Sequence, residues 1–255
     1  MDKVAHYRDK ASEIYKANRK IIFILAFLDT VLVSLFDILK ADGFISNLLV
    51  IIVKLAVTAP LPMCTYHVYT RAILGKQTGA DFIFSWLTNG KLIVHGIKVQ
   101  LSLAIRLIGW IIIYFIIAIA STLFGVLGSL VGTIGGLILI YYKELQYEGA
   151  LYECAADPNY PVSAAFDDGI EKMKYCFKDY VSLWLGMCLP FMVIFSLLTS
   201  IFETSAIGIT VNALGNAILN FFILPRFHIT GILLYNNGNF SHVRGVDGEE
   251  NLNEE

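Results

Sequence analysis

Residues 107–142 decide the fold. They read LIGWIIIYFIIAIASTLFGVLGSLVGTIGGLILIYY, and these 36 residues include no Asp, Glu, Lys, Arg or His. A helix rises about 1.5 Å per residue and the hydrocarbon core of a bilayer is about 30 Å thick. The run is therefore too long for one transmembrane helix and predicts a hairpin of two, turning in the glycine-marked stretch 125–128. Four other apolar runs flank it, so the chain is expected to be an all-α, polytopic membrane bundle.

The composition points to the same class of protein. Hydrophobic residues make up 56% of the chain and charged residues 16%, and the mean hydropathy is +0.66. A soluble domain usually carries about 25% charged residues. The four cysteines are scattered and form no C-x-x-C pair, so we interpret Cys64, Cys154, Cys176 and Cys188 as reduced, small hydrophobic side chains.

Hydropathy predicts six spans in three hairpins within a single membrane domain, residues 1–236. The acidic tail, residues 237–255, is expected to be disordered and cytoplasmic. A cleaved signal peptide is not expected, because the first apolar run follows a 20-residue polar lead and is longer than a signal-peptide core. The predicted spans are 21–39, 48–66, 101–123, 126–142, 180–202 and 205–224.

The basic residues predict the orientation. With six spans, 17 of the 19 Lys and Arg fall on one side of the membrane, and the exceptions are Lys40 and Lys54. This count includes Arg106, which stands near the start of the third span and can extend its side chain to the interface. The positive-inside rule makes that side cytoplasmic and places both termini there. The predicted location is the cell membrane, with multiple passes.

A cytoplasmic amphipathic helix is expected before each hairpin. The first, third and fifth spans begin near residues 21, 101 and 180, and apolar residues recur at helical spacing before the first and the last of them. The middle segment, 82–94, is less regular. Either a threefold repeat or the constraint of bilayer thickness on hairpin length accounts for the equal spacing. The apolar positions are Val4, Tyr7, Ala11, Ile14 and Tyr15 in the first helix and Val162, Phe166, Ile170, Met173 and Phe177 in the last.

Three short motifs resemble an uncharacterised family of integral membrane proteins from Gram-positive bacteria. They are the opening YRDKASEIYKANRK of residues 7–20, the segment YEGALYECAADPNYPVS of residues 147–163 and the pair Met173-Lys174. The late Pro225 followed by Leu234-Tyr235 also fits that family, which is distantly similar to the membrane domains of glycerophosphodiester phosphodiesterases. In the fifth helix the chain has LWLG at 183–186, where the family tends to have an aromatic-Ile-Gly-Trp run. The resemblance implies a six-helix fold and no established activity.

Two charged residues stand within the first predicted hairpin. Asp29 is near the middle of the first span and Lys54 is six residues inside the second, where a charge costs at least about 2.5–3.5 kcal/mol. A lysine stem can reach either Asp29 or Asp37 across antiparallel helices. The alternatives are a neutralising pair that only fixes helix packing and a functional intramembrane group.

The last span carries an asparagine ladder at i, i+4 and i+8: Asn212, Asn216 and Asn220. Each step turns the helix by about 40°, so the three carboxamides form one polar stripe that lipid cannot satisfy. Hydrogen bonds between helices, worth about 0.6 kcal/mol each, are one interpretation. The wall of a polar solute path is the other.

Glycines and prolines mark other helix contacts. Gly128, Gly132 and Gly136 repeat every four residues in the fourth span, which favours close helix packing, more often within one chain than between two. Pro60, Pro62, Pro190 and Pro225 are expected to bend three other spans, because proline has no amide hydrogen to donate.

No catalytic signature occurs, and the five histidines are too dispersed for a metal site. We therefore predict a protein without enzymatic activity, cofactor, metal or nucleic-acid partner: a membrane module whose interfacial helices bind lipid, a membrane-protein partner or a second copy of the chain. The alternative is a small transporter or permease component with a polar path near Asp29 and the ladder. An intramembrane enzyme is the third and weakest hypothesis, since only the buried acids favour it.

Overall fold

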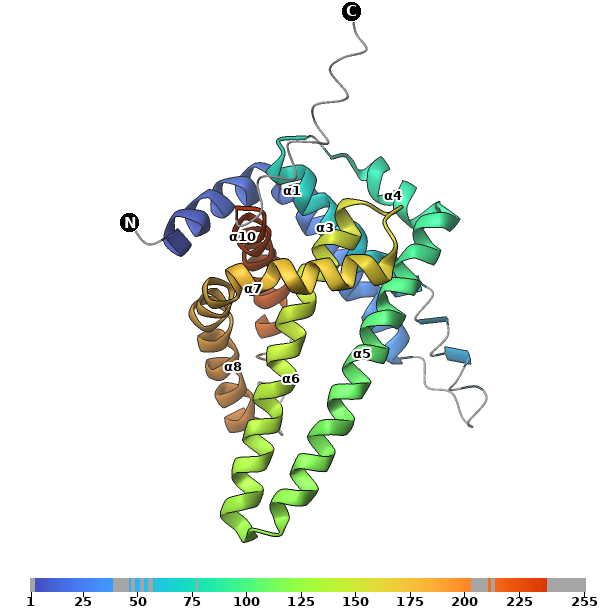
Figure 1. Ribbon diagram of the computed structural model, residues 1–255. Helices are drawn as coiled ribbons and strands as arrows, with labels where there is room; N and C mark the ends of the chain where they lie inside the picture. Colours follow the sequence, from blue (N-terminus) through green and yellow to red (C-terminus); the bar gives the residue numbers. More distant parts are fainter. Residues whose placement is uncertain are drawn as a thin grey trace, which may run out of the picture. The chain divides into compact units, whose positions relative to one another are not determined.

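The computed structural model describes residues 3–38, 46, 49–50, 53–54, 57–76, 78–202, 211 and 214–237. All secondary structure in these ranges is helical (Figure 1). The predicted tail, 237–255, lies outside them apart from Asn237. The elements are α1 (Lys3–Ile38), α3 (Pro60–Ile73), α4 (Ala80–Thr88), α5 (Gly90–Thr122), α6 (Gly125–Ala156), α7 (Val162–Met187), α8 (Leu189–Phe202), the π-helix η1 (Leu219–Ile223) and α10 (Leu224–Asn237).

Four stretches of helix are long and apolar enough to cross a membrane, as expected of a membrane protein. They are Gly90–Thr122, Gly125–Ala156, Val162–Ile201 and Leu214–Asn237, counted over the described residues. Large apolar side chains stand exposed on the first of them; Ile112 is 54% exposed and Ile116 62%. Such a surface is stable beside lipid chains and unfavourable in water. The arrangement of six spans in three hairpins stays a prediction.

The chain divides into two compact units. The first comprises Met1–Lys40, Thr65–Ile83 and Tyr175–Glu255, and the second Ala41–Cys64 and Phe84–Lys174. In the first unit α1 packs along α10 and η1 (Figure 1). Ile22 and Leu25 of α1 and Ile229 and Ile232 of α10 are almost completely buried. Each such side chain stabilises the fold by about 1.5–3 kcal/mol.

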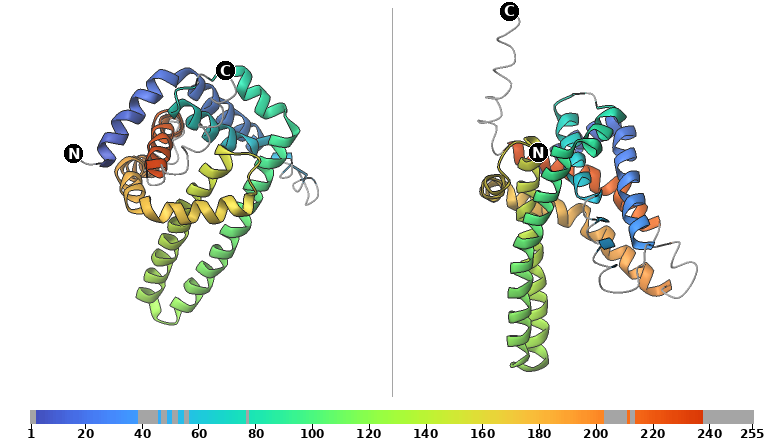
Figure 2. Two further views of the ribbon diagram at one scale, coloured as in Figure 1. Left: turned by 45° about the horizontal axis from the view of Figure 1, so that its top comes forward. Right: turned by 90° about the vertical axis from the view of Figure 1, so that its right-hand side faces the viewer.

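The second unit is built around the antiparallel pair α5 and α6, which lie side by side in both views of Figure 2. The turn falls at Leu123 and Phe124, just before the stretch 125–128 that the sequence indicates, and Gly125 follows with φ +73°. That left-handed conformation favours glycine, which has no Cβ to clash. A Cβ at Gly132 would overlap the Ser121 side chain.

The same close contact recurs one turn further along α6, where a Cβ at Gly136 would overlap the Tyr114 ring. At Gly128 a Cβ would overlap the Phe124 side chain and the Ser121 carbonyl. The three glycines thus face the turn and α5 of their own chain. Their small size lets the two backbones approach closely.

Helix boundaries differ from the predicted spans because helices continue past the change from apolar to polar sequence. The amphipathic start of α1 and its apolar part form one helix from Lys3 to Ile38, and α6 continues to Ala156, well beyond residue 142. The opposite holds near Pro190, where α7 ends at Met187 and α8 begins at Leu189. Pro190 has no amide hydrogen for the Gly186 carbonyl, so the helix changes direction there.

Candidate functional site

The two charges of the first predicted hairpin fall in different units. Asp29 is a half-buried residue of α1 in the first unit, and Lys54 is a half-buried residue of the second. Asp29 interacts with α3: burial raises the pKa of the Tyr69 hydroxyl, and the negative charge of Asp29 raises it further. The pairing of Asp29 with Lys54 stays a prediction, and the side chain of Asp37 lies outside the described residues.

One residue of the asparagine ladder lines a small cavity. Asn216 borders a space of about 170 Å³ together with Ser196 and Thr199 of α8 and the Phe191 and Phe195 rings. Asn220 lies within η1 and is half-buried, and Asn212 lies outside the described residues. The Thr199 hydroxyl donates to the carbonyl of Phe195 in its own helix, 2.9 Å away. The wall of the cavity is therefore partly polar, and the cavity has room for several water molecules.

A proline and a tyrosine shape the join between α1 and the last helix. The Leu224 amide donates to the Leu219 carbonyl, which is the wider i to i−5 spacing of a π-helix. Pro225 has no amide hydrogen for the Phe221 carbonyl four residues earlier. The Tyr15 hydroxyl donates to that carbonyl instead, at 2.8 Å. The Arg226 guanidinium lies over the Tyr15 ring, 4.8 Å from its centre.

Tyr15 is a buried neutral phenol in this arrangement. Burial raises its pKa, and the positive charges of Arg226 and Arg19 oppose that rise. Because the pKa of the Tyr15 phenol is raised above its ordinary value, the hydroxyl stays protonated at neutral pH and keeps its role as hydrogen-bond donor.

Beside Tyr15 lies an apolar groove of about 470 Å³ whose lining includes two cations. Arg19 and Lys20 stand one helical turn before Phe23 and Ile24, so the charged side chains precede the apolar ones along α1. The Phe23 ring stacks on Phe221 of η1, with ring centres 4.6 Å apart. We call this the lipid groove, after the ligand that we propose for it, and its residues are Tyr15, Arg19, Lys20, Phe23, Ile24 and Phe222.

A second hollow, of about 330 Å³, has Arg226 in its lining. It combines two guanidinium groups, a hydroxyl and a carboxylate, and we call it the basic pocket. The Nε atom of Arg226 is buried and has no hydrogen-bond partner among the described residues. The basic pocket is lined by Arg8, Asp9, Ser12, Gly186, Met187, Ile223 and Arg226.

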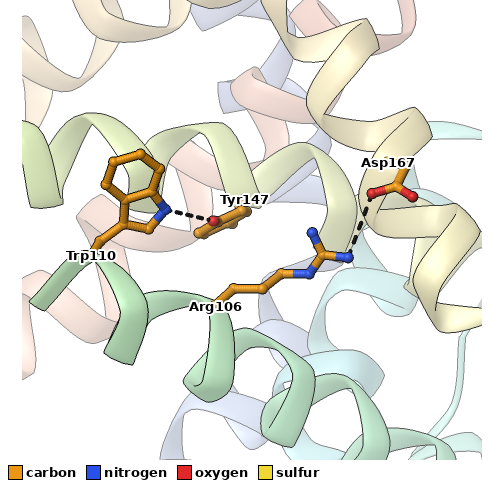
Figure 3. A network of polar contacts seen from close by, with 4 residues as sticks. All are labelled: Arg106, Trp110, Tyr147 and Asp167. Carbon is orange, nitrogen blue, oxygen red and sulfur yellow. Dashed lines mark hydrogen bonds and ion pairs between the residues drawn. The ribbon is translucent and has the colours of Figure 1, made fainter. Parts of the chain in front are cut away.

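The second unit holds a polar network where α5, α6 and α7 meet (Figure 3). The Trp110 indole nitrogen donates to the Tyr147 hydroxyl at 3.0 Å. The Arg106 guanidinium pairs with Asp167 at 3.5 Å and lies 4.9 Å from the centre of the Phe166 ring. These contacts join three helices; the sequence alone indicated only that Arg106 reaches the interface.

The segment 147–163 supplies further links within this unit. The Lys172 ammonium pairs with Glu153 at 2.7 Å, and a His95 ring nitrogen lies 2.9 Å from the Cys154 carbonyl. The Tyr160 hydroxyl donates to Asp168 at 2.6 Å, and this hydrogen bond raises the pKa of Tyr160. Each of these side chains and carbonyls contacts a neighbouring helix, so the segment connects α6 with α5 and α7.

The described residues contain no group of three or more His, Cys, Asp or Glu side chains arranged to hold a metal ion. The four cysteines are buried as free thiols. Comparisons with models of protein families, with curated proteins and with solved structures find no match for the chain. The resemblance to a Gram-positive membrane family stays a prediction.

Proposed function

We propose that the protein is a multi-pass, non-enzymatic protein of the cell membrane that binds anionic lipid through α1. In this proposal six spans form three hairpins, and both termini are cytoplasmic, where the surplus of Lys and Arg places them. The amphipathic part of α1 then lies at the level of the headgroups, and its apolar continuation enters the membrane.

The lipid groove is the observation that carries the proposal. Arg19 and Lys20 stand where the headgroup of an anionic lipid would lie, and Phe23, Ile24 and Phe222 line the space for an acyl chain. A cation near an anionic membrane surface contributes about 1 kcal/mol of attraction. The apolar walls add burial of hydrocarbon, at about 0.8 kcal/mol per CH₂.

The test compares lipid binding by charge-matched variants of the full chain purified in detergent. Arg19→Gln with Lys20→Gln removes both cations of the lipid groove. Lys10→Gln with Lys16→Gln removes two exposed cations of the same helix that line neither the groove nor the basic pocket. Binding of phosphatidylglycerol and of phosphatidylcholine with the same chains is measured by native mass spectrometry.

The groove variant is expected to lose about 2 kcal/mol of affinity for phosphatidylglycerol, or about 30-fold, and little for phosphatidylcholine. The control variant should bind both lipids nearly as the unchanged protein does. Equal losses in the two variants would contradict the proposal, because the effect would then follow from total charge alone.

A second function, a small transporter component, has one observation in its favour: Asn216 borders a cavity that also has two hydroxyl-bearing side chains on its wall. Single cysteines at Asn216 and Asn220 distinguish the alternatives. Labelling of both by a small hydrophilic thiol reagent would support a wet path. Protection of both would contradict transport along this helix.

A further inference from the structure

We propose that the basic pocket binds the phosphodiester of a polyol lipid headgroup, whose acyl chain occupies the adjoining lipid groove. This inference rests on the proposed function and names the lipid class that the site would select. All residues of the pocket and the groove belong to the first compact unit.

The basic pocket lies between α1 and two helix irregularities caused by proline. Gly186 and Met187 precede the break at Pro190, and Ile223 and Arg226 flank the junction of η1 and α10. The Gly186 carbonyl lies four residues before Pro190, so its usual helical donor is absent. Gly186 also has no side chain to fill the hollow.

The charges of the basic pocket match a phosphodiester. Arg8 and Arg226 contribute two positive charges and Asp9 one negative charge, which leaves a net charge of +1. A phosphodiester carries one negative charge, whereas a phosphomonoester carries about −1.5 to −2 at pH 7. The second charge of a monoester would meet the Asp9 carboxylate.

The hydrogen-bonding groups fit the same ligand. Arg226 is held over the Tyr15 ring at 4.8 Å, and its buried Nε–H has no acceptor among the described residues. A guanidinium can donate two parallel hydrogen bonds to a phosphate, and the Ser12 hydroxyl can donate another. The Asp9 carboxylate and the Gly186 carbonyl are acceptors suited to the hydroxyl groups of a polyol.

The pocket and the groove are adjacent through one contact. Arg226 lines the pocket, and the Tyr15 ring beneath it lines the groove. Two consecutive residues line different hollows: Phe222 lines the lipid groove and Ile223 lines the basic pocket. A single lipid can therefore place its phosphate beside Arg226 and a chain against Phe222.

The test measures how the full chain in detergent discriminates between two anionic lipids with identical chains, phosphatidylglycerol and phosphatidic acid. The unchanged protein should bind phosphatidylglycerol about tenfold more tightly than phosphatidic acid. This is the difference expected for one charge-assisted hydrogen bond from a polyol hydroxyl to the Asp9 carboxylate. Asp9→Asn should bring this ratio close to one, because it removes the repulsion of the second phosphate charge. Equal affinities in the unchanged protein, or an unchanged ratio in Asp9→Asn, would overturn the proposal.

Further variants separate the basic pocket from the lipid groove. Arg8→Gln changes an exposed side chain and should weaken both lipids about tenfold, whereas Lys10→Gln should weaken neither. Arg19→Gln with Lys20→Gln should weaken both lipids, and phosphatidic acid no less than phosphatidylglycerol, because its phosphate carries the larger charge. If this groove variant binds both lipids normally, the proposed function is contradicted. The ratio of the two affinities in the unchanged protein and in Asp9→Asn still tests the basic pocket.

A soluble probe distinguishes a lipid from a free phosphodiester as the ligand of the basic pocket. Glycerophosphoglycerol, the deacylated headgroup, should displace bound phosphatidylglycerol only at much higher concentration than the lipid itself. Displacement at equal concentration would overturn the assignment to a lipid, because the groove would then contribute nothing.

Discussion

The Tyr15 hydroxyl donates a 2.8 Å hydrogen bond to the Phe221 carbonyl, 206 residues away in the sequence. Pro225, four residues later, has no amide hydrogen to offer this carbonyl. A side chain of α1 thus replaces a backbone donor of the last helix. The same tyrosine supports Arg226 and lines the lipid groove, so one residue connects the helix join with both candidate lipid contacts.

Tyr15→Phe is expected to destabilise the protein by about 0.5–1.5 kcal/mol, the net value of one hydrogen bond. Pro225→Ala restores an amide donor for the Phe221 carbonyl, so Tyr15→Phe should cost less in that background. Thermal unfolding in detergent measures the four members of this double-mutant cycle. Tyr175→Phe, at a tyrosine that is 76% exposed, is the control and should cost almost nothing. Additive effects would show that the two sites do not interact.

The polar network of the second unit predicts a ranking of two substitutions. Tyr147→Phe removes the acceptor of the Trp110 indole N–H from a residue that is only 6% exposed, so a loss of about 1–3 kcal/mol is expected. Asp167→Asn weakens the ion pair with Arg106, but the Asp167 side chain is 73% exposed and the loss should stay below about 1 kcal/mol. Unfolding temperatures in the reverse order would contradict this account of the network.

Adjacent glycines of α6 provide a matched test of helix packing. Gly136→Ala places a Cβ against the Tyr114 ring and is expected to destabilise α5–α6 packing by about 1–3 kcal/mol. Gly135→Ala meets nothing within 4 Å and should be neutral, or stabilising by up to about 1 kcal/mol through helix propensity. Thermal unfolding of the two variants checks the difference. Similar effects would indicate that Gly136 does not face α5.

The six-span topology is testable by cysteine labelling in whole cells, after the four buried cysteines are replaced. Cysteines at Lys91 and Lys172 should be protected from an impermeant reagent until the membrane is opened. Cysteines near Asp42 and Glu203, which lie outside the described residues, should be labelled from outside. External labelling at Lys172 would overturn this topology.

Hydropathy predicted the helical class and a turn between α5 and α6 because 36 uncharged residues exceed one bilayer crossing. The glycines of residues 125–128 indicated a position just after the observed turn at Leu123 and Phe124. It could not predict where helices end, since hydropathy reports the surrounding solvent and not the backbone hydrogen bonds. The predicted span therefore ended at residue 142, whereas α6 continues to Ala156. At Pro190 the residue type did indicate the break between α7 and α8.

The candidate site was only partly visible in the sequence. Arg19 and Lys20, with the apolar Phe23 and Ile24 one turn later, are four of the six residues that line the lipid groove. From the sequence alone, Arg19 and Lys20 served only to predict which side of the membrane is cytoplasmic. Phe222 and Arg226 complete the two hollows from more than 200 residues away, and only the packing of α1 against the last helix brings them there. Local periodicity contains no information on such a contact.

Photo-crosslinking with a phosphatidylglycerol that carries a diazirine on its acyl chain tests the central claim most directly. Mass spectrometry of the peptides should find adducts at Phe23, Ile24 or Phe222, and excess unlabelled phosphatidylglycerol should suppress them more strongly than phosphatidylcholine does. Adducts on exposed residues of α5 should respond equally to both competitors, because they report general lipid contact. Equal competition at the groove, or adducts only on α5 and α6, would contradict anionic-lipid binding by α1.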